Sequence, residues 1–153
     1  MSAILSATEI DQLRHIAGTM IPASAEFGIP GADDPAILAD LLKSLSRDLP
    51  LVREAIAAIG TKADGAFADL SVDKREALIV QYHANGGPSA AALGRVILSA
   101  YYRDDRVLLS LGLEARSPFP KGHVLEQGDW SLLDVVRHRA PFWRDDRASG
   151  GGR

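Results

Sequence analysis

Apolar residues recur every three or four positions over most of this chain, and prolines and glycines interrupt the pattern at intervals. Ile10, Leu13, Ile16 and Met20, for example, share one face of a helix. No stretch of any length alternates apolar and polar residues as a half-buried strand does. The pattern therefore predicts an all-α fold of about six helices with two long irregular loops, from Ile21 to Asp33 and from Leu113 to Gly128.

Capping residues and helix stops divide the pattern into segments. A capping acid followed by proline, as in Asp34-Pro35, is typical of a helix start, and glycine is typical of a helix end. A helix over residues 89–102 is apolar on most sides, so we expect it to be central, with Gly94 allowing a close neighbour. The other boundaries are a Thr8 cap, a Leu49-Pro50 break, a Ser71 cap, a helix from Asp105 to Gly112, and a last helix from Asp129 to Arg139.

Length and composition indicate one folded domain. With 153 residues, 24% of them charged and 46% apolar, the chain can build a hydrophobic core of its own. We expect this domain over residues 1–148 and a flexible tail over 149–153. The net charge of −3 disfavours a nucleic-acid partner, and no apolar run approaches the ~20 residues that cross a membrane. Because the first residues form no export signal, we expect a cytoplasmic protein, or a periplasmic one if a leader was removed or a partner is exported with it.

The residues that usually carry catalysis do not assemble into a known pattern. The chain has no cysteine, no nucleotide-binding glycine fingerprint and no G-x-S-x-G nucleophile elbow. Adjacent acids such as Asp104-Asp105 are expected to serve as helix caps. We therefore predict no catalytic, metal-binding or cofactor-binding residue in this chain. The histidines are scattered at positions 15, 83, 123 and 138.

The second loop and the C-terminal end are richer in apolar and aromatic residues than solvent-exposed segments usually are. Long irregular segments in compact domains are usually functional, and tryptophan and arginine are enriched at interface hot spots. We expect Trp143 to contact a partner and Trp130 to pack inward; the alternative is that both tryptophans close the core of the chain. The predicted partner interface comprises Phe119, His123, Val124, Leu125, Phe142, Trp143 and Arg144.

Three segments, in this order, resemble a known family. Residues 20–23 with 29–33, residues 101–107 with 111–113, and residues 117–123 are similar to segments of the gluconate 2-dehydrogenase subunit 3 family. The resemblance spans about residues 13–123. The residues that carry it are Ile21, Pro22, Ala23, Pro30, Gly31, Ala32, Tyr101, Tyr102, Gly112, Pro118 and Gly122.

This resemblance implies a small, helical, non-catalytic subunit. Members of the family accompany a large FAD-dependent dehydrogenase of the glucose-methanol-choline type, which oxidises sugars or other alcohols, and support its folding, stability or maturation. A cytochrome sometimes completes the complex. Two alternatives stay open: a stand-alone helical enzyme with a site near Tyr101, Tyr102 and His123, and a helical scaffold or regulator unrelated to redox chemistry.

Overall fold

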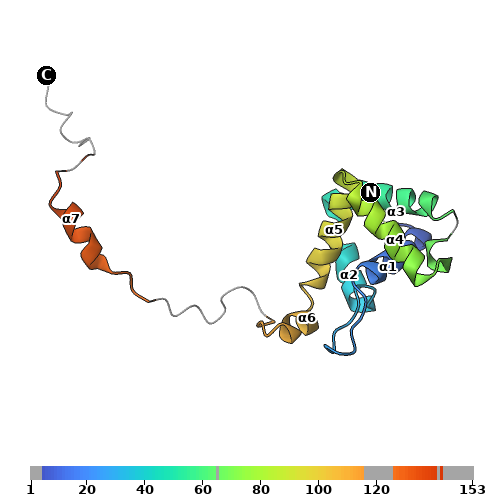
Figure 1. Ribbon diagram of the computed structural model, residues 1–153, viewed down its shortest axis with the longest axis horizontal. Helices are drawn as coiled ribbons and strands as arrows, with labels where there is room; N and C mark the ends of the chain where they lie inside the picture. The colour runs from blue at the N-terminus through green and yellow to red at the C-terminus, as the bar shows by residue number, and fades with distance from the viewer. Residues whose placement is uncertain (1–4, 65, 116–125, 141, 143–153) are drawn as a thin grey trace, which may run out of the picture. The chain divides into compact units, whose positions relative to one another are not determined.

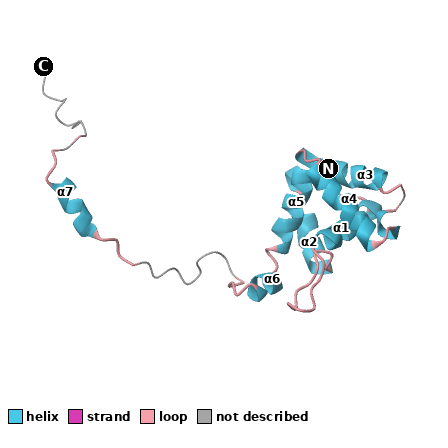
Figure 2. Ribbon diagram, viewed as in Figure 1, coloured by secondary structure: helices cyan, strands magenta, loops and turns pink. Residues whose placement is uncertain are grey.

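The computed structural model describes residues 5–64, 66–115, 126–140 and 142, and within them the only regular secondary structure is helical (Figure 2). A single antiparallel bridge joins Ser24 and Ile29, and no strand is present in these residues. The predicted all-α class is confirmed.

The chain divides into two compact units at Ser117–Pro118, and each is described by itself. The first unit, the helical body, contains six α-helices and two 3₁₀ helices among its described residues. Its elements are α1 Ala7–Met20, α2 Pro35–Ser44, η1 Ser46–Asp48, α3 Leu49–Lys62, η2 Phe67–Asp69, α4 Val72–Ala84, α5 Pro88–Tyr101 and α6 Asp105–Ser110 (Figure 1).

Helix α5 lies at the centre of the body, as predicted. It packs mainly against α3 and α2, and α1 packs mainly against α4 (Figure 1). More residues are buried on α5 than on any other described helix, because its inward face combines large and small apolar side chains that let its neighbours fit closely. The buried residues of α5 are Ala90, Ala92, Leu93, Val96, Ile97, Ala100 and Tyr101.

Helix starts follow the capping rules, with one shift from prediction. Asp34 caps α2 and Pro35 opens it, as predicted; the Asp34 side chain accepts a hydrogen bond from the Ala36 amide at 2.9 Å. The predicted Thr8 cap is wrong. Ser6 caps α1 in a reciprocal capping box with Glu9, which satisfies two terminal amides at once. Helix α6 begins at Asp105, as predicted, and Asp104 caps it: its side chain accepts a hydrogen bond from the Arg106 amide at 2.9 Å.

The prediction that Gly94 admits a close neighbour is wrong. A methyl group at Gly94 would meet only the His83 ring, at 3.6 Å, which is an ordinary contact. A glycine that backbone atoms do enclose is Gly31, in the loop between α1 and α2. A β-carbon there would lie 2.9 Å from the Ala23 amide nitrogen and 3.2 Å from the Ile21 carbonyl oxygen.

We expect Gly31→Ala to lower the free energy of unfolding by about 1–3 kcal/mol, because backbone atoms have to move to admit the methyl group. Gly94→Ala is the matched control and should be neutral or stabilising by up to about 1 kcal/mol, because alanine favours the helix. Urea unfolding followed by circular dichroism measures both. If both substitutions change the free energy of unfolding equally, the loop accommodates the methyl group at little cost and this prediction is wrong.

The second unit contains η3 Trp130–Leu133 and α7 Asp134–Arg137 among its described residues. The predicted helix from Asp129 to Arg139 is therefore split, since its first turn is 3₁₀. The expectation that Trp130 packs inward is wrong: this side chain is 61% exposed, and Leu133 and Val136 are exposed as well. So short a helical segment has no second layer of its own on which to bury them. The domain boundary at residue 148 stays a prediction, and the tail at 149–153 lies outside the described residues.

Candidate functional site

Two of the segments that carry the family resemblance meet in the helical body. The loop after α1 is closed by a hydrogen bond from the Ala32 amide to the Ile21 carbonyl at 2.9 Å. The Tyr101 hydroxyl, at the end of α5, donates to the Pro30 carbonyl at 3.3 Å. This tyrosine is 3% exposed, and burial raises the pKa of its hydroxyl. Tyr101 therefore stays protonated and anchors the loop to α5.

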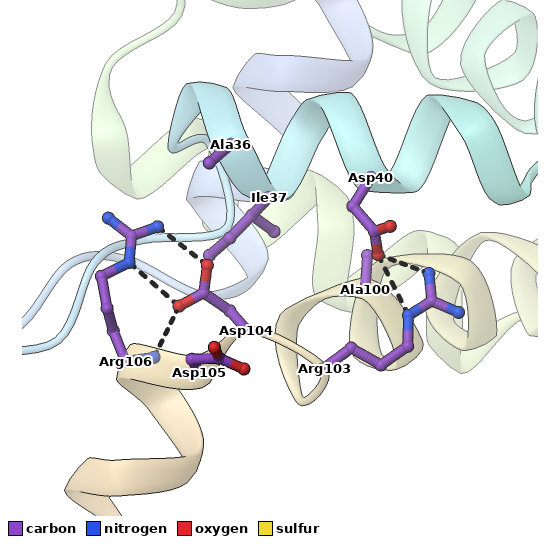
Figure 3. A pocket seen from close by; sticks show the side chains of 8 residues that line it. All are labelled: Ala36, Ile37, Asp40, Ala100, Arg103, Asp104, Asp105 and Arg106. Carbon is purple, nitrogen blue, oxygen red and sulfur yellow. Dashed lines mark hydrogen bonds and ion pairs between the residues drawn. The ribbon is translucent and has the colours of Figure 1, made fainter. Parts of the chain in front are cut away.

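Arg106 joins the starts of two helices. Its guanidinium donates to both carboxylate oxygens of Asp34 at 2.8 and 3.0 Å, and to both of Asp104 at 2.9 Å (Figure 3 shows the bonds to Asp104). Asp34 caps α2 and Asp104 caps α6, so one arginine bridges the two capping residues. Fork geometry of this kind is the strong form of an arginine–carboxylate contact.

A pocket of about 300 Å³ lies beside this bridge. On its other side, Arg103 of the α5–α6 turn donates to Asp40 of α2, with Nε at 3.0 Å and Nη2 at 2.6 Å (Figure 3). Both arginines are thus paired within the protein, and the arrangement favours a clamp between α2 and α6 over a ligand site. The pocket is lined by Ala36, Ile37, Asp40, Ala100, Arg103, Asp104, Asp105 and Arg106.

The bridge makes stability depend on pH. Hydrogen bonds from Arg106 hold the pKa of Asp34 and of Asp104 below the ordinary aspartate range. A carboxyl whose pKa is lower in the folded than in the unfolded protein contributes its full stabilisation above the unfolded pKa of about 3.9 and loses it as pH falls through the folded pKa.

We therefore expect the free energy of unfolding to decrease as pH falls from about 5 toward 3, and this decrease to be smaller in Arg106→Gln. Lys43→Gln, which removes one exposed positive charge elsewhere on α2, is the control and should keep the wild-type pH dependence. Urea unfolding at a series of pH values measures the free energy of unfolding of the wild type and of each variant. An unchanged pH profile in Arg106→Gln would contradict the role of this bridge.

Most of the predicted interface lies outside the described residues. This holds for Phe119, His123, Val124, Leu125, Trp143 and Arg144, and for Pro118 and Gly122 of the family motif. Phe142 is described and is 86% exposed. In the second unit the large apolar side chains that can be placed are all exposed to solvent: Trp130, Leu132, Leu133, Val135, Val136 and Phe142.

Two further motif residues, Tyr102 and Gly112, lie just after α5 and α6. Gly112 adopts a φ of 72° and ends α6, as predicted, with the Leu113 amide donating to the Leu108 carbonyl at 3.0 Å. Tyr102 is half-exposed and stacks edge-on against Tyr101, with ring centres 5.4 Å apart. Among the described residues, the structure thus brings Tyr101 and Tyr102 together without a base or nucleophile bonded to either.

Sequence reasoning missed a second group of charged residues, between α1 and α4. Arg14, His15, Asp33 and Arg75 line a common pocket there, although Asp33 and Arg75 are far apart along the chain. Their signal in the sequence is weak because each looks like an ordinary surface residue.

Searches for similarity to known proteins bring no assignment. The chain matches no protein-family model, and no curated protein or solved structure matches it significantly. In the part of the chain that the structure describes, no three acidic or histidine side chains gather as metal ligands would. None of the helices described has both the length and the apolar character needed to cross a membrane.

Proposed function

We propose that this chain is a non-catalytic accessory subunit that binds and stabilises a larger partner enzyme. The observation that carries the proposal is the second unit, whose large apolar side chains are exposed wherever they are described. A segment of this kind gains stability by burying those side chains on another surface, and isolated helices of its length are marginal in water.

The helical body supports a binding role over a catalytic one. Tyr101 holds the loop at Pro30, and the two arginines of the neighbouring pocket, Arg103 and Arg106, are paired with aspartates. Catalytic side chains, in contrast, need a nucleophile, a base and an orienting group within hydrogen-bond reach. The alternative, a stand-alone enzyme with a site near Tyr101, Tyr102 and His123, is weaker because the described contacts of Tyr101 are structural, and His123 lies outside the described residues.

The resemblance to the gluconate 2-dehydrogenase subunit 3 family indicates the class of enzyme to which the partner belongs. We propose a large FAD-dependent oxidoreductase of the glucose-methanol-choline type that acts on CH–OH groups of sugars or other alcohols. The FAD belongs to that partner, and this chain holds no cofactor of its own. A cytochrome is the less favoured third component. The compartment is that of the partner, which we expect to be the cytoplasm.

The test is co-expression with a flavoprotein dehydrogenase encoded beside this chain. We expect a yellow complex to co-purify, and the large subunit alone to be less soluble and less loaded with flavin. Phe142→Ala should weaken assembly by about tenfold or more, as truncating an interface anchor does. Phe27→Ala removes an exposed phenylalanine from the helical body and is the matched control, with no effect expected.

Three outcomes would count against parts of this proposal. A large subunit that is equally soluble and flavin-loaded without this chain contradicts the accessory role. A stable complex with a protein that lacks flavin favours the scaffold or regulator alternative. Turnover by the lone chain favours the enzyme alternative.

A further inference from the structure

The pocket between α1 and α4 holds charged side chains whose placement the fold does not explain. It has a volume of about 210 Å³ and lies entirely in the helical body. Residues from both helices and from the loop after α1 contribute to it. Its lining consists of Arg14, His15, Gly18, Thr19, Pro22, Asp33, Val72, Arg75 and Glu76.

Arg75 is the cation that lacks an acceptor. Its Nε has essentially no solvent access and no hydrogen-bond partner, and its guanidinium forms no ion pair with any residue that the structure describes. A guanidinium stays charged at every physiological pH. Because the guanidinium lines the pocket and has no ion-pair partner among the described residues, its terminal nitrogens are available to an acceptor that arrives from outside.

The other two basic side chains in the pocket are already engaged. Arg14 donates to Asp11 at 2.8 Å and approaches His15 Nε2 at 3.4 Å, while His15 Nδ1 lies 2.9 Å from the Asp11 carbonyl oxygen. Both side chains therefore already have partners within α1. Arg75 is thus left as the cation available to a ligand.

Two carboxylates in the same pocket, those of Asp33 and Glu76, also lack a side-chain partner among the described residues. Asp33 is packed against glycines: a β-carbon at Gly18 would lie 2.9 Å from the Asp33 β-carbon. The Asp33 side chain therefore occupies the space that a larger residue at position 18 would fill. No described residue supplies a counter-ion to its carboxylate there.

We propose that this pocket binds a small monocarboxylic acid whose other end carries a hydrogen-bond donor. The ligand's carboxylate accepts from the terminal nitrogens of Arg75, and its hydroxyl or ammonium group donates to Asp33 or Glu76. The two carboxylates of the pocket repel a dianion such as phosphate more strongly than a monoanion, and an ammonium group on the ligand offsets part of that repulsion. The volume suits a molecule of a few heavy atoms.

The test is a titration of the full-length chain at constant ionic strength, followed by the amide NMR signals of Gly18 and Thr19. The probes are alanine, lactate, propionate and inorganic phosphate. We expect saturable shifts with alanine or lactate, and the stronger of the two identifies the donor as ammonium or hydroxyl. Propionate, which has the carboxylate but no donor, and phosphate should bind at least about tenfold more weakly.

Variants assign the binding to the proposed groups. Arg75→Gln should weaken binding of the preferred probe by about tenfold or more. Arg47→Gln removes an arginine outside the pocket and should leave binding unchanged. Arg75→Lys keeps the charge and should retain part of the affinity, which covers the case in which Arg75→Gln unfolds. Asp33→Asn should reduce the preference for the preferred probe over propionate.

Three results would overturn the proposal. The first is the absence of saturable shifts with both alanine and lactate, and the second is shifts that persist unchanged in Arg75→Gln. The third is a double-mutant cycle in which Arg75 and Asp33, or Arg75 and Glu76, stabilise the protein jointly, because the pocket is then closed by an internal ion pair.

Discussion

Replacing Phe67 with alanine is expected to lower the free energy of unfolding by about 3–5 kcal/mol. Phe67 is 1% exposed and is the largest fully buried side chain among the described residues. It lies in η2, which packs against α1, and so closes the core on the side where the chain passes from α3 to α4. Truncation leaves a cavity that the surrounding helices fill only in part.

Phe27→Ala is the matched control, because Phe27 is 67% exposed in the loop after α1. We expect it to change the free energy of unfolding by less than about 0.5 kcal/mol. Both variants are compared with the wild type by urea unfolding monitored by circular dichroism. A loss below about 1 kcal/mol in Phe67→Ala would mean that η2 is not part of the cooperative core.

Ending the chain after Ser117 is expected to abolish assembly with the partner while leaving the helical body folded. The hydrophobic core is formed by residues of the first unit, so the melting temperature should remain close to that of the full chain. Assembly should weaken by more than about a hundredfold, because the deletion removes every residue of the proposed interface together.

The readouts are thermal melting of the lone chain and co-purification with the large subunit. Phe142→Ala and Trp143→Ala in the full chain show how much of the loss of assembly each of these two side chains accounts for. If the truncated chain melts far below the full one, residues after 117 belong to the core. If it assembles normally, the interface lies on the helical body and the proposed role of the second unit is wrong.

Local sequence signals located the helices because the relevant physics is local. Asp34-Pro35 places a capping acid and a preset φ angle at one point, and Gly112 supplies the left-handed conformation that ends α6. Ser6 was missed in favour of Thr8 because both are hydroxyl residues, and only the reciprocal contact with Glu9 distinguishes them. Trp130 was placed inward because a periodic pattern shows which residues share a face and not whether a second layer covers it.

Local sequence patterns do not predict which residues far apart in the chain come into contact. The bridge from Arg106 to Asp34 spans 72 positions, and the contact of Tyr101 with Pro30 spans 71. Gly31 and Gly94 look alike in the sequence, yet one is enclosed by backbone atoms and the other is not.

The sequence by itself therefore determined the all-α class, the helix boundaries to within a few residues, and the central position of α5, because periodicity and capping act over a few residues. Only the tertiary structure decided which charges are paired. It pairs Arg106 and Arg103 with aspartates on α2 or at its start, and it leaves Arg75 without an acceptor among the described residues. Pairing depends on which helices become neighbours, and that is set by the packing of the whole core.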